Sequence, residues 1–317
     1  MSTTILMLSV DEAARLERSL PAAAAQPGAQ VLVVDNACAD STRDVAAAHG
    51  ARVLHLRRRV SYAAAVNAGI VASEGDAILL LNADCVLDPG FLDAARARLE
   101  AAGVGSVAPR IVRATGMQVA DRLDVLDTAG MVIDRRRKNG LVGHNEPASR
   151  YGRRAEAFGG DGACVLYRRE VLEACAVGGE VLDEDLQLWA SDVDLAWRAR
   201  LLGWRCVYEP AALAWHVRFY SPSTRAALPK AHRRLQFRNR LLMMAKNDTW
   251  SDVRGDLHRI ALYEVLALGH VLLRERHLLR AYRDAWRALP AARRRRAVVQ
   301  ARRRPRARPP FGLRPRP

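Results

Sequence analysis

The sequence predicts an α/β fold in which a mostly parallel sheet is covered by helices on both faces. Short apolar runs alternate with Ala- and Leu-rich helical segments through the first hundred residues. The runs are continuously apolar, as expected for strands that are buried on both faces. Half of the 317 residues are hydrophobic, which is enough for one large core with a helical annex.

The first third of the chain contains the clearest alternation of strands and helices. Asp40 or Ser41 is placed to cap the second helix, and Asp88-Pro89-Gly90 introduces the fourth. Strands are expected at Thr4–Ser9, Gln30–Asp35, Arg52–Leu56 and Ala77–Leu81, and helices at Glu12–Ala25, Ser41–His49, Tyr62–Ser73 and Phe91–Ala101.

The rest of the chain divides into a less regular stretch and an all-helical end. Residues 110–157 are polar and are expected to form loops with short strands. We therefore predict an α/β domain at 1–228, a helical annex at 229–292 and a disordered Arg/Pro-rich tail at 293–317. Further strands are expected at Ala163–Tyr167, Trp204–Tyr208 (stopped by Pro210) and Ala212–His216, and helices at Arg169–Ala174, Ser191–Leu202 (closed by Gly203) and His232–Lys246. The helical pattern over Asp252–Ala288 is compatible with a helical hairpin that packs on the α/β domain or with an interfacial helix beside an acidic membrane.

The net charge of +16 is concentrated in the tail. Residues 293–317 hold eleven Arg and no acidic residue, which leaves a net charge of +5 for residues 1–292. The body is therefore only mildly basic, and no specific nucleic acid is expected as a partner. The tail is compatible with non-specific nucleic-acid binding, with attraction to an acidic membrane surface, or with no partner.

The cysteine pattern and the absence of targeting signals favour a cytoplasmic protein. The five cysteines include no CxxC pair and are odd in number, which fits a reducing compartment. No signal peptide is visible, and no apolar run approaches the roughly 18 residues of a membrane span. At most, the basic C-terminal region is expected to touch the inner face of the plasma membrane peripherally.

Carboxylates follow two of the predicted strands. The strand at 30–35 ends in Asp35-Asn36, and the strand at 77–81 is followed by Asn82-Ala83-Asp84. Ligands of open α/β sheets bind at the carboxyl ends of the strands, where such groups contact a base or ribose or hold a hard cation such as Mg²⁺. Each motif alone is equally compatible with a turn or a cap.

Two further positions carry candidate chemistry later in the chain. Asp192 and Asp194 lie near a predicted helix N-terminus, where acids either stabilise the helix or act as a general base. Helical geometry points their side chains about 200° apart, so we expect one to face the cleft and the other to support it. His216 ends a predicted strand, as a structural residue or a metal ligand.

Together and in this order, these elements resemble family 2 glycosyltransferases of GT-A fold, especially the rhamnosyltransferase-like branch. The resemblance covers about residues 3–247, and it implies a mixed sheet flanked by helices. The residues that carry it are Val33-Val34-Asp35-Asn36, Tyr62–Ile70, Leu80-Leu81-Asn82-Ala83-Asp84, Pro89-Gly90-Phe91, Gly162-Ala163-Cys164, Leu182-Asp183-Glu184, Asp192–Arg198, Gly203-Trp204-Arg205, Pro210, His216, Arg238-Asn239 and Lys246-Asn247.

The resemblance implies a binding site for a nucleotide-diphosphate sugar. Asp35 would contact the nucleotide base, and Asn67 and Asn82 would belong to the donor site. Asp84 would hold a divalent metal, Mg²⁺ or Mn²⁺, that bridges the donor diphosphate, and His216 would complete the metal site. A dTDP- or UDP-sugar is the implied donor, with dTDP-rhamnose as the first choice.

The resemblance also implies an inverting transfer in which Asp192 is the catalytic base. The acceptor would be a saccharide or lipid-linked saccharide of cell-surface polysaccharide synthesis. Ser191 stands where the family has Glu, and Val10-Asp11 stands where it has Tyr-Asn. These differences motivate the alternative of a catalytically impaired nucleotide-sugar-binding protein. A third hypothesis is a basic nucleic-acid-binding protein that depends on the tail.

Overall fold

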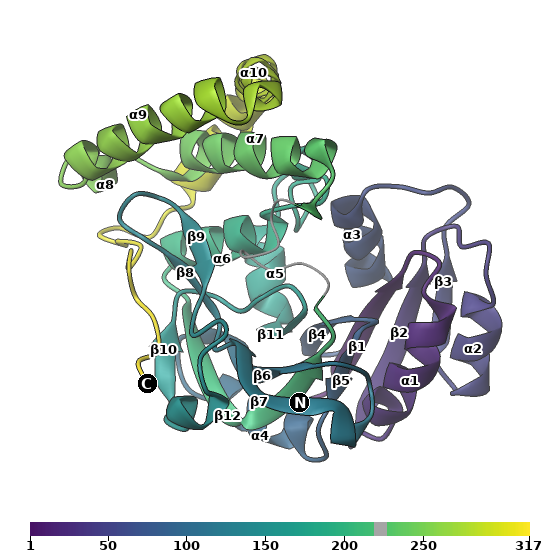
Figure 1. Ribbon diagram of the computed structural model, residues 1–317. Coiled ribbons are helices and arrows are strands. Elements are labelled where there is room, and N and C mark those ends of the chain that lie inside the picture. Colours follow the sequence, from purple (N-terminus) through teal and green to yellow (C-terminus); the bar gives the residue numbers. More distant parts are fainter. Residues whose placement is uncertain (219–226) are drawn as a thin grey trace.

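The computed structural model describes residues 1–218 and 227–317 and confirms the α/β fold (Figure 1). Within the described residues a ten-stranded sheet has the order β10-β12-β6-β11-β4-β1-β2-β3, with β5 on β12 and β7 on β6. The strands are β1 Thr3–Ser9, β2 Ala29–Asp35, β3 Arg52–His55, β4 Ala77–Asn82, β5 Cys85–Leu87, β6 Val104–Ala114, β7 Arg122–Thr128, β8 Met131–Ile133, β9 Asn139–Leu141, β10 Ala155–Ala157, β11 Cys164–Arg168 and β12 Arg205–His216.

Helices cover both faces of this sheet. On β1, Ile5 belongs to one apolar cluster and Leu6 to another, and Leu79 and Leu80 on β4 are divided in the same way. Both faces of the sheet are thus covered by apolar side chains and shielded from water, which explains why the strand sequences are continuously apolar. The helices are α1 Ala13–Ala24, α2 Thr42–Ala48, α3 Tyr62–Ala72, α4 Phe91–Leu99, α5 Arg169–Cys175, α6 Ser191–Leu201, α7 Lys230–Asn247, α8 Trp250–Val253, α9 Leu257–Leu273 and α10 Leu279–Ala301.

The sheet is mixed rather than mostly parallel. Strands β4, β1, β2 and β3 are parallel, and their register places Asp35 beside Ser9 and Asn82 beside Leu8. The next strand, β11, runs antiparallel to both β4 and β6. The carboxyl ends of β1, β2 and β4 therefore meet at one edge, where the predicted carboxylates lie.

One strand continues where the sequence predicts two. Pro210 is expected to end the first, but β12 runs from Arg205 to His216 beside β6. The register shifts between Glu209 and Leu213, so the chain absorbs the proline in a bulge. This bulge carries β12 on to His216 at the edge of the sheet.

The helical annex contains two helices where residues 252–288 carry the helical pattern. The chain breaks at Arg274–Leu278 and separates α9 from α10, as the helical-hairpin alternative predicts. Figure 1 shows α9 above α7 on the side remote from the sheet, and α10 running from beside α9 behind α7 toward α6. The predicted C′ position of α6 is confirmed, because Gly203 has a φ of +87°.

The tail is structured where the sequence predicts disorder from residue 293 onward. Helix α10 continues to Ala301, and Phe311 beyond it packs against Trp197 with ring centroids 5.2 Å apart. Arg303 pairs with Asp252 at 2.7 Å. The Arg/Pro-rich composition does not predict these contacts, because they depend on a few apolar side chains and on acidic partners that are distant in the sequence.

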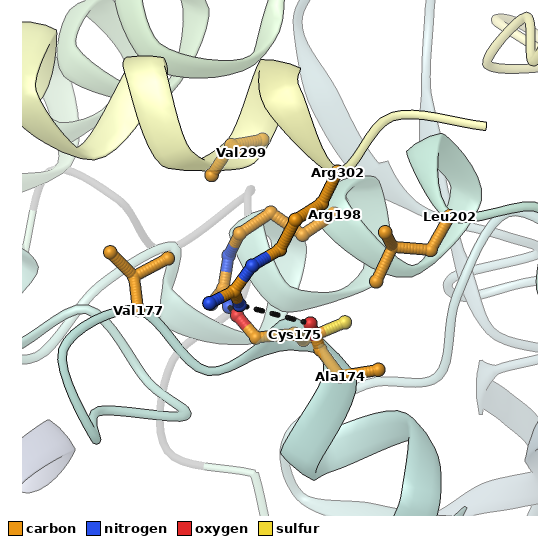
Figure 2. Close-up of a pocket in the computed structure, with 7 residues that line it drawn as sticks. All are labelled: Ala174, Cys175, Val177, Arg198, Leu202, Val299 and Arg302. Carbon is orange, nitrogen blue, oxygen red and sulfur yellow. Dashed lines mark hydrogen bonds between the residues drawn. The ribbon is translucent and has the colours of Figure 1, made fainter. Parts of the chain in front are cut away.

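The end of α10 is seated on the junction of α5 and α6 (Figure 2). Val299 and Arg302 line a gap of about 10 Å³ together with Arg198 and Cys175. Arg198 donates to the Cys175 carbonyl, and Arg302 donates to the Ala176 carbonyl. The gap has room for about one water molecule, so it is a packing defect rather than a ligand site.

Two remaining predictions concern cysteines and membrane spans. None of the five cysteines forms a disulfide. In residues 1–218 and 227–317, no helix combines the length and the apolar character needed to cross a bilayer.

Candidate active site

A cavity of about 650 Å³ opens at the edge of the sheet where β1 and β4 end. Asn82 and Asp84 line it from the sheet, and Asp192 lines it from the N-terminus of α6. Its outer wall includes Phe237 on α7 and Tyr263 on α9, so the annex helps to enclose it. The volume lies within the usual range for small-molecule sites.

Asp84 and His216 are brought together although 132 residues separate them. Strand β5 pairs with the end of β12, and His216 Nε2 lies 3.1 Å from Asp84 Oδ1. His216 Nδ1 lies 2.9 Å from Oδ2 of Asp127 on β7, a buried carboxylate that our sequence analysis missed. Because an ionised carboxylate only accepts, each ring nitrogen carries a proton in this arrangement.

The charges of this cluster reinforce one another. Burial alone would lower the pKa of His216, but its hydrogen bonds to Asp127 and Asp84 raise the pKa to about 10. Burial would likewise raise the pKa of Asp84, but the hydrogen bond and charge of His216 lower it. The pKa of Asp127 is lowered too, because His216 and Arg218 outweigh its burial. Asp84 and Asp127 are therefore carboxylates.

Arg218 extends the cluster toward Asp192. Its Nε lies 2.7 Å from Asp127 Oδ1, and its Nη2 lies 3.0 Å from Asp161 Oδ2. Our sequence analysis singled out neither residue. Arg218 follows His216 closely, and Asp161 lies inside the Gly159–Gly162 turn, so proximity to recognised motifs is the one signal available in the sequence.

Asp192 has the environment of a general base. Its Oδ2 accepts from Gly162 N at 3.1 Å and its Oδ1 from Val193 N at 2.8 Å. Burial, followed by the charge of Asp161, raises the pKa of Asp192 to about 6 despite these two donors. A carboxylate with a pKa near the operating pH, fixed at a cavity wall, is suited to take up a proton.

The loop before α6 holds Asp192 in place. Gln187 and Ala190 adopt left-handed backbone conformations, with φ of 64° and 67°. Such conformations are costly for these residue types and persist where the surroundings impose them. Here Asn239 of α7 donates to the carbonyls of Leu186 and Trp189, at 2.6 and 2.7 Å. The annex thus fixes the loop that leads into the candidate base.

Asp194 has a structural role, as the opposed directions of the two acids predict. It is fully buried, and its carboxylate accepts from Arg198 Nε at 2.9 Å and from Lys246 Nζ at 2.9 Å. Burial would raise its pKa, but the charges of Lys246 and Arg198 lower it. Lys246 also pairs with Asp183. This buried ion cluster joins α6 to α7.

Asp35 and Asn67 do not line the cavity. Asp35 is buried, and its oxygens accept from Cys38 N and face His55 Nδ1, both at 2.7 Å. The Asn67 side-chain amide donates to the Leu182 carbonyl and accepts from the Leu182 N–H, each at 2.8 Å. In this structure both side chains brace loops around the site.

The Asp84–His216 pair suits a divalent cation. An imidazole nitrogen and a carboxylate oxygen 3.1 Å apart at the cavity edge would supply two ligands, and substrate phosphates commonly supply others to Mg²⁺ or Mn²⁺. Asp127 would fix the imidazole from its other nitrogen. Such a cation would replace the Nε2 proton that now lies between the two side chains.

A second group of potential ligand atoms lies at the start of α1. Atoms of Asp11, Cys38 and Asp40 lie within 4.8 Å of one another. Asp11 already pairs with Arg59 at 2.6 Å, and Asp40 accepts from Ala13 N at 2.8 Å. These contacts indicate that the group stabilises the loops around the start of α1.

Comparison with known proteins adds a family and a fold to this geometry. A family model described as "Glycosyltransferase like family 2" matches residues 2–238. An uncharacterized protein of Sinorhizobium fredii is 28% identical over 205 residues, which are 62% of this chain and 21% of that protein. An uncharacterized glycosyltransferase of Mycobacterium tuberculosis is 42% identical over 86 residues, 26% of this chain and 39% of that protein. The chain thus spans about one fifth to two fifths of these relatives.

Solved structures share the fold at low sequence identity. The mannosyltransferase PcManGT of Pyrobaculum calidifontis, in complex with GDP-Man and Mn²⁺, superposes with a TM-score of 0.54 at 19% identity and covers 94% of this chain and 79% of its own. TarS 1–349 of S. aureus, in complex with UDP-GlcNAc, superposes with a TM-score of 0.58 at 14% identity. The superposition covers 95% of this chain and 89% of the TarS chain. These likenesses support the GT-A fold and a mixed sheet.

Proposed function

The chain belongs to the glycosyltransferase-like family 2, and from this membership we propose that it transfers a sugar from a nucleotide-diphosphate donor to a hydroxyl acceptor. Transfer would invert the configuration at the anomeric carbon. The acceptor class that we propose is a saccharide or a lipid-linked saccharide.

The observation that carries the proposal is the shared cavity of Asp84 and Asp192. One wall offers a carboxylate paired with His216, and another offers a carboxyl whose pKa is raised to about 6. A donor diphosphate fits the first environment and an acceptor hydroxyl fits the second. The volume of about 650 Å³ accommodates a nucleotide sugar.

In the proposed reaction, Asp192 accepts the proton of the acceptor hydroxyl. The oxygen forms a bond to the anomeric carbon while the bond from that carbon to the diphosphate oxygen breaks, and the electron pair leaves with the nucleoside diphosphate. Gly162 N–H and Val193 N–H hold the Asp192 carboxylate during attack. Attack from the face opposite the leaving group produces inversion.

Asp84 and His216 would hold the divalent cation, Mg²⁺ or Mn²⁺. When bound, it neutralises charge on the leaving diphosphate. Asp127 positions His216, and Asn82 beside Asp84 lines the donor end of the cavity. Asp35 and Asn67 support the donor site by bracing the loops after β2 and before α6.

Ser191 bears on the alternative of an impaired nucleotide-sugar-binding protein. Its Oγ is buried and has no hydrogen-bond partner among the described residues. The carboxylate that we propose as the base accepts from two backbone N–H groups and from no side chain at position 191, which favours an active enzyme over this alternative. The nucleic-acid alternative is less well supported, because tail residues Arg295 and Arg303 are engaged by Glu180 and Asp252.

A thermal-shift panel with Mg²⁺ or Mn²⁺ tests donor binding. Donors are dTDP-rhamnose first, then UDP- and GDP-sugars, because a ligand of the native state raises the melting temperature. The shift is expected to disappear with EDTA and in Asp84→Asn, but to persist in the exposed control Asp93→Asn. A panel without any shift contradicts the proposal. A shift without donor turnover above background supports the impaired binding protein instead.

A further inference from the structure

Helix α9 directs most of its apolar side chains away from the protein. It buries only Ile260 and Val271. Leu262, Val265, Leu266 and Leu273 are 62%, 67%, 63% and 80% exposed. Their spacing of three, four and seven residues places them in one stripe along the helix, where a soluble surface would carry polar residues.

The inner side of α9 is held largely by ion pairs. Glu264 pairs with Arg240 of α7 at 2.6 Å, and Asp256 before the helix pairs with Arg137 at 2.9 Å. Beyond its C-terminus, Glu275 pairs with Arg233. Two buried apolar side chains and these ion pairs thus hold the inner side of α9, while its apolar stripe faces outward. A contiguous exposed apolar face of this kind marks an interaction surface.

The outer side of α10 adds aromatic and basic groups. Trp286 is 75% exposed, and the exposed Arg283 lies three residues before Trp286 and four residues before the exposed Arg287, so it neighbours both on the helix surface. No ion pair engages either arginine within the described residues. Figure 1 shows α9 and the beginning of α10 above α7, on the side remote from the sheet. Exposed Leu, Trp and Arg side chains on successive helices are typical of helices that lie in a membrane interface.

We propose that the outer face of α9 and α10 docks on the surface of an anionic lipid bilayer. The apolar stripe would enter the headgroup–acyl boundary, and Arg283 and Arg287 would contact anionic headgroups. A two-fold dimer through the same face would place one copy's arginines in an interface with the same basic surface of the other copy, so charge complementarity favours anionic lipid over a second copy of the chain.

This docking would place the acceptor side of the cavity near the membrane. Tyr263 lies on α9 between the exposed positions, and it lines the cavity together with Phe237 and Arg240 of α7. The wall of the cavity and the docking face are thus two sides of one helix layer. If the proposed function holds, a bilayer at the docking face would present lipid-linked saccharides at this wall of the cavity. Among the acceptors proposed above, we therefore favour lipid-linked saccharides.

Vesicle binding of the full chain tests the docking face without any catalytic readout. Large vesicles of phosphatidylcholine with phosphatidylglycerol are compared with vesicles of phosphatidylcholine alone by co-sedimentation. Wild-type protein is expected to bind the anionic vesicles and to bind the neutral ones more weakly. The double substitution Leu262→Gln with Leu266→Gln is expected to weaken binding at least about tenfold.

Matched controls separate the docking face from general surface chemistry. Val71→Gln with Val119→Gln changes two comparably exposed apolar residues elsewhere and is expected to leave binding unchanged. Arg283→Gln with Arg287→Gln should weaken binding to anionic vesicles, whereas Arg18→Gln with Arg153→Gln should not. Circular dichroism and the melting temperature confirm that each variant is folded.

Three results would overturn the docking proposal. They are a wild-type chain that stays in the supernatant with anionic vesicles, unchanged binding by the Leu262/Leu266 variant, and a dimer in light scattering that this variant dissociates without any vesicle binding. The last result would assign the face to a second copy. Donor binding measured in solution reports separately on the proposed function, so either proposal can fail alone.

Discussion

His216 Nδ1 lies 2.9 Å from Asp127 Oδ2, which leaves Nε2 of the same ring to face Asp84 at 3.1 Å. The buried carboxylate thus orients the imidazole and determines which nitrogen is available at the cavity edge. Carboxylates in this position fix the tautomer and raise the basicity of a histidine ligand. Asp127 is therefore a positioning residue for the proposed cation site.

Asp127→Asn is predicted to weaken Mn²⁺ binding about 10- to 100-fold. The amide retains the size of the side chain but removes the charge that orients His216. Affinity is measured by calorimetric titration of the full chain with Mn²⁺ in the presence of UDP. Asp124→Asn, an exposed position on the same strand, is the control. Equal Mn²⁺ affinity in both variants would show that Asp127 does not act through His216.

The parts of the site that follow apolar strands could be predicted from the sequence, but the parts that pair across the sheet could not. Asp84 is recognisable because it follows a buried strand. Asp127 lies in the polar stretch 110–157, and its link to His216 spans 89 residues through β6, β7 and β12. No local pattern encodes such a pairing, because it depends on long-range register.

The bulge in β12 and the break in the annex have local physical causes that propensity does not capture. Pro210 is tolerated because a bulge removes the need for its missing N–H. The break before α10 carries no Gly or Pro signal. There Glu275 turns inward to Arg233, so a tertiary ion pair accompanies the interruption of the helical pattern. The tail is likewise ordered through distant partners such as Trp197.

Asp192→Asn is predicted to lower donor turnover about 10²- to 10⁴-fold while leaving the donor-induced melting shift intact. Wild-type kcat/KM should rise with pH through about 6, because burial and Asp161 keep Asp192 protonated below that value. Turnover is followed by release of the nucleoside diphosphate across a pH series. A variant that keeps wild-type turnover, or a profile flat through pH 6, would reassign the base.

Asp192→Asn is also predicted to stabilise the fold at about pH 7.5, by about 1–3 kcal/mol. The folded pKa of Asp192 is about 6, above its usual value of 3.8, so the folded state binds the proton more tightly. The resulting stability is fully present below about pH 4 and is lost as pH rises through 6. The advantage of the Asn variant should therefore vanish at low pH. Urea unfolding across pH measures this difference, and a gain independent of pH would refute the shift.

Gly162→Ala is predicted to reduce turnover about 10- to 100-fold with little change in donor affinity. An added Cβ would lie 3.2 Å from Asp192 Oδ2, so the carboxylate or the turn must move. Gly152→Ala is the control, because its added Cβ meets only one atom, at 3.9 Å. Turnover and the donor melting shift are measured on both. Unchanged turnover in Gly162→Ala would mean that the position of Asp192 tolerates this displacement.

Lys246→Ala is predicted to lower the free energy of unfolding by about 3–5 kcal/mol. Lys246 is 2% exposed and pairs with both Asp183 and Asp194, so its removal takes one buried positive charge from two buried carboxylates and leaves them only Arg295 and Arg198. The loss is measured by urea unfolding against Lys230→Ala, an exposed position on the same helix that should change stability little. Because the cluster joins α6 to α7, the weakened contact should also release the loop that Asn239 holds before Asp192. Lys246→Ala should consequently lose donor turnover at temperatures below its melting transition, and a variant with full turnover there would show that the annex does not position the base.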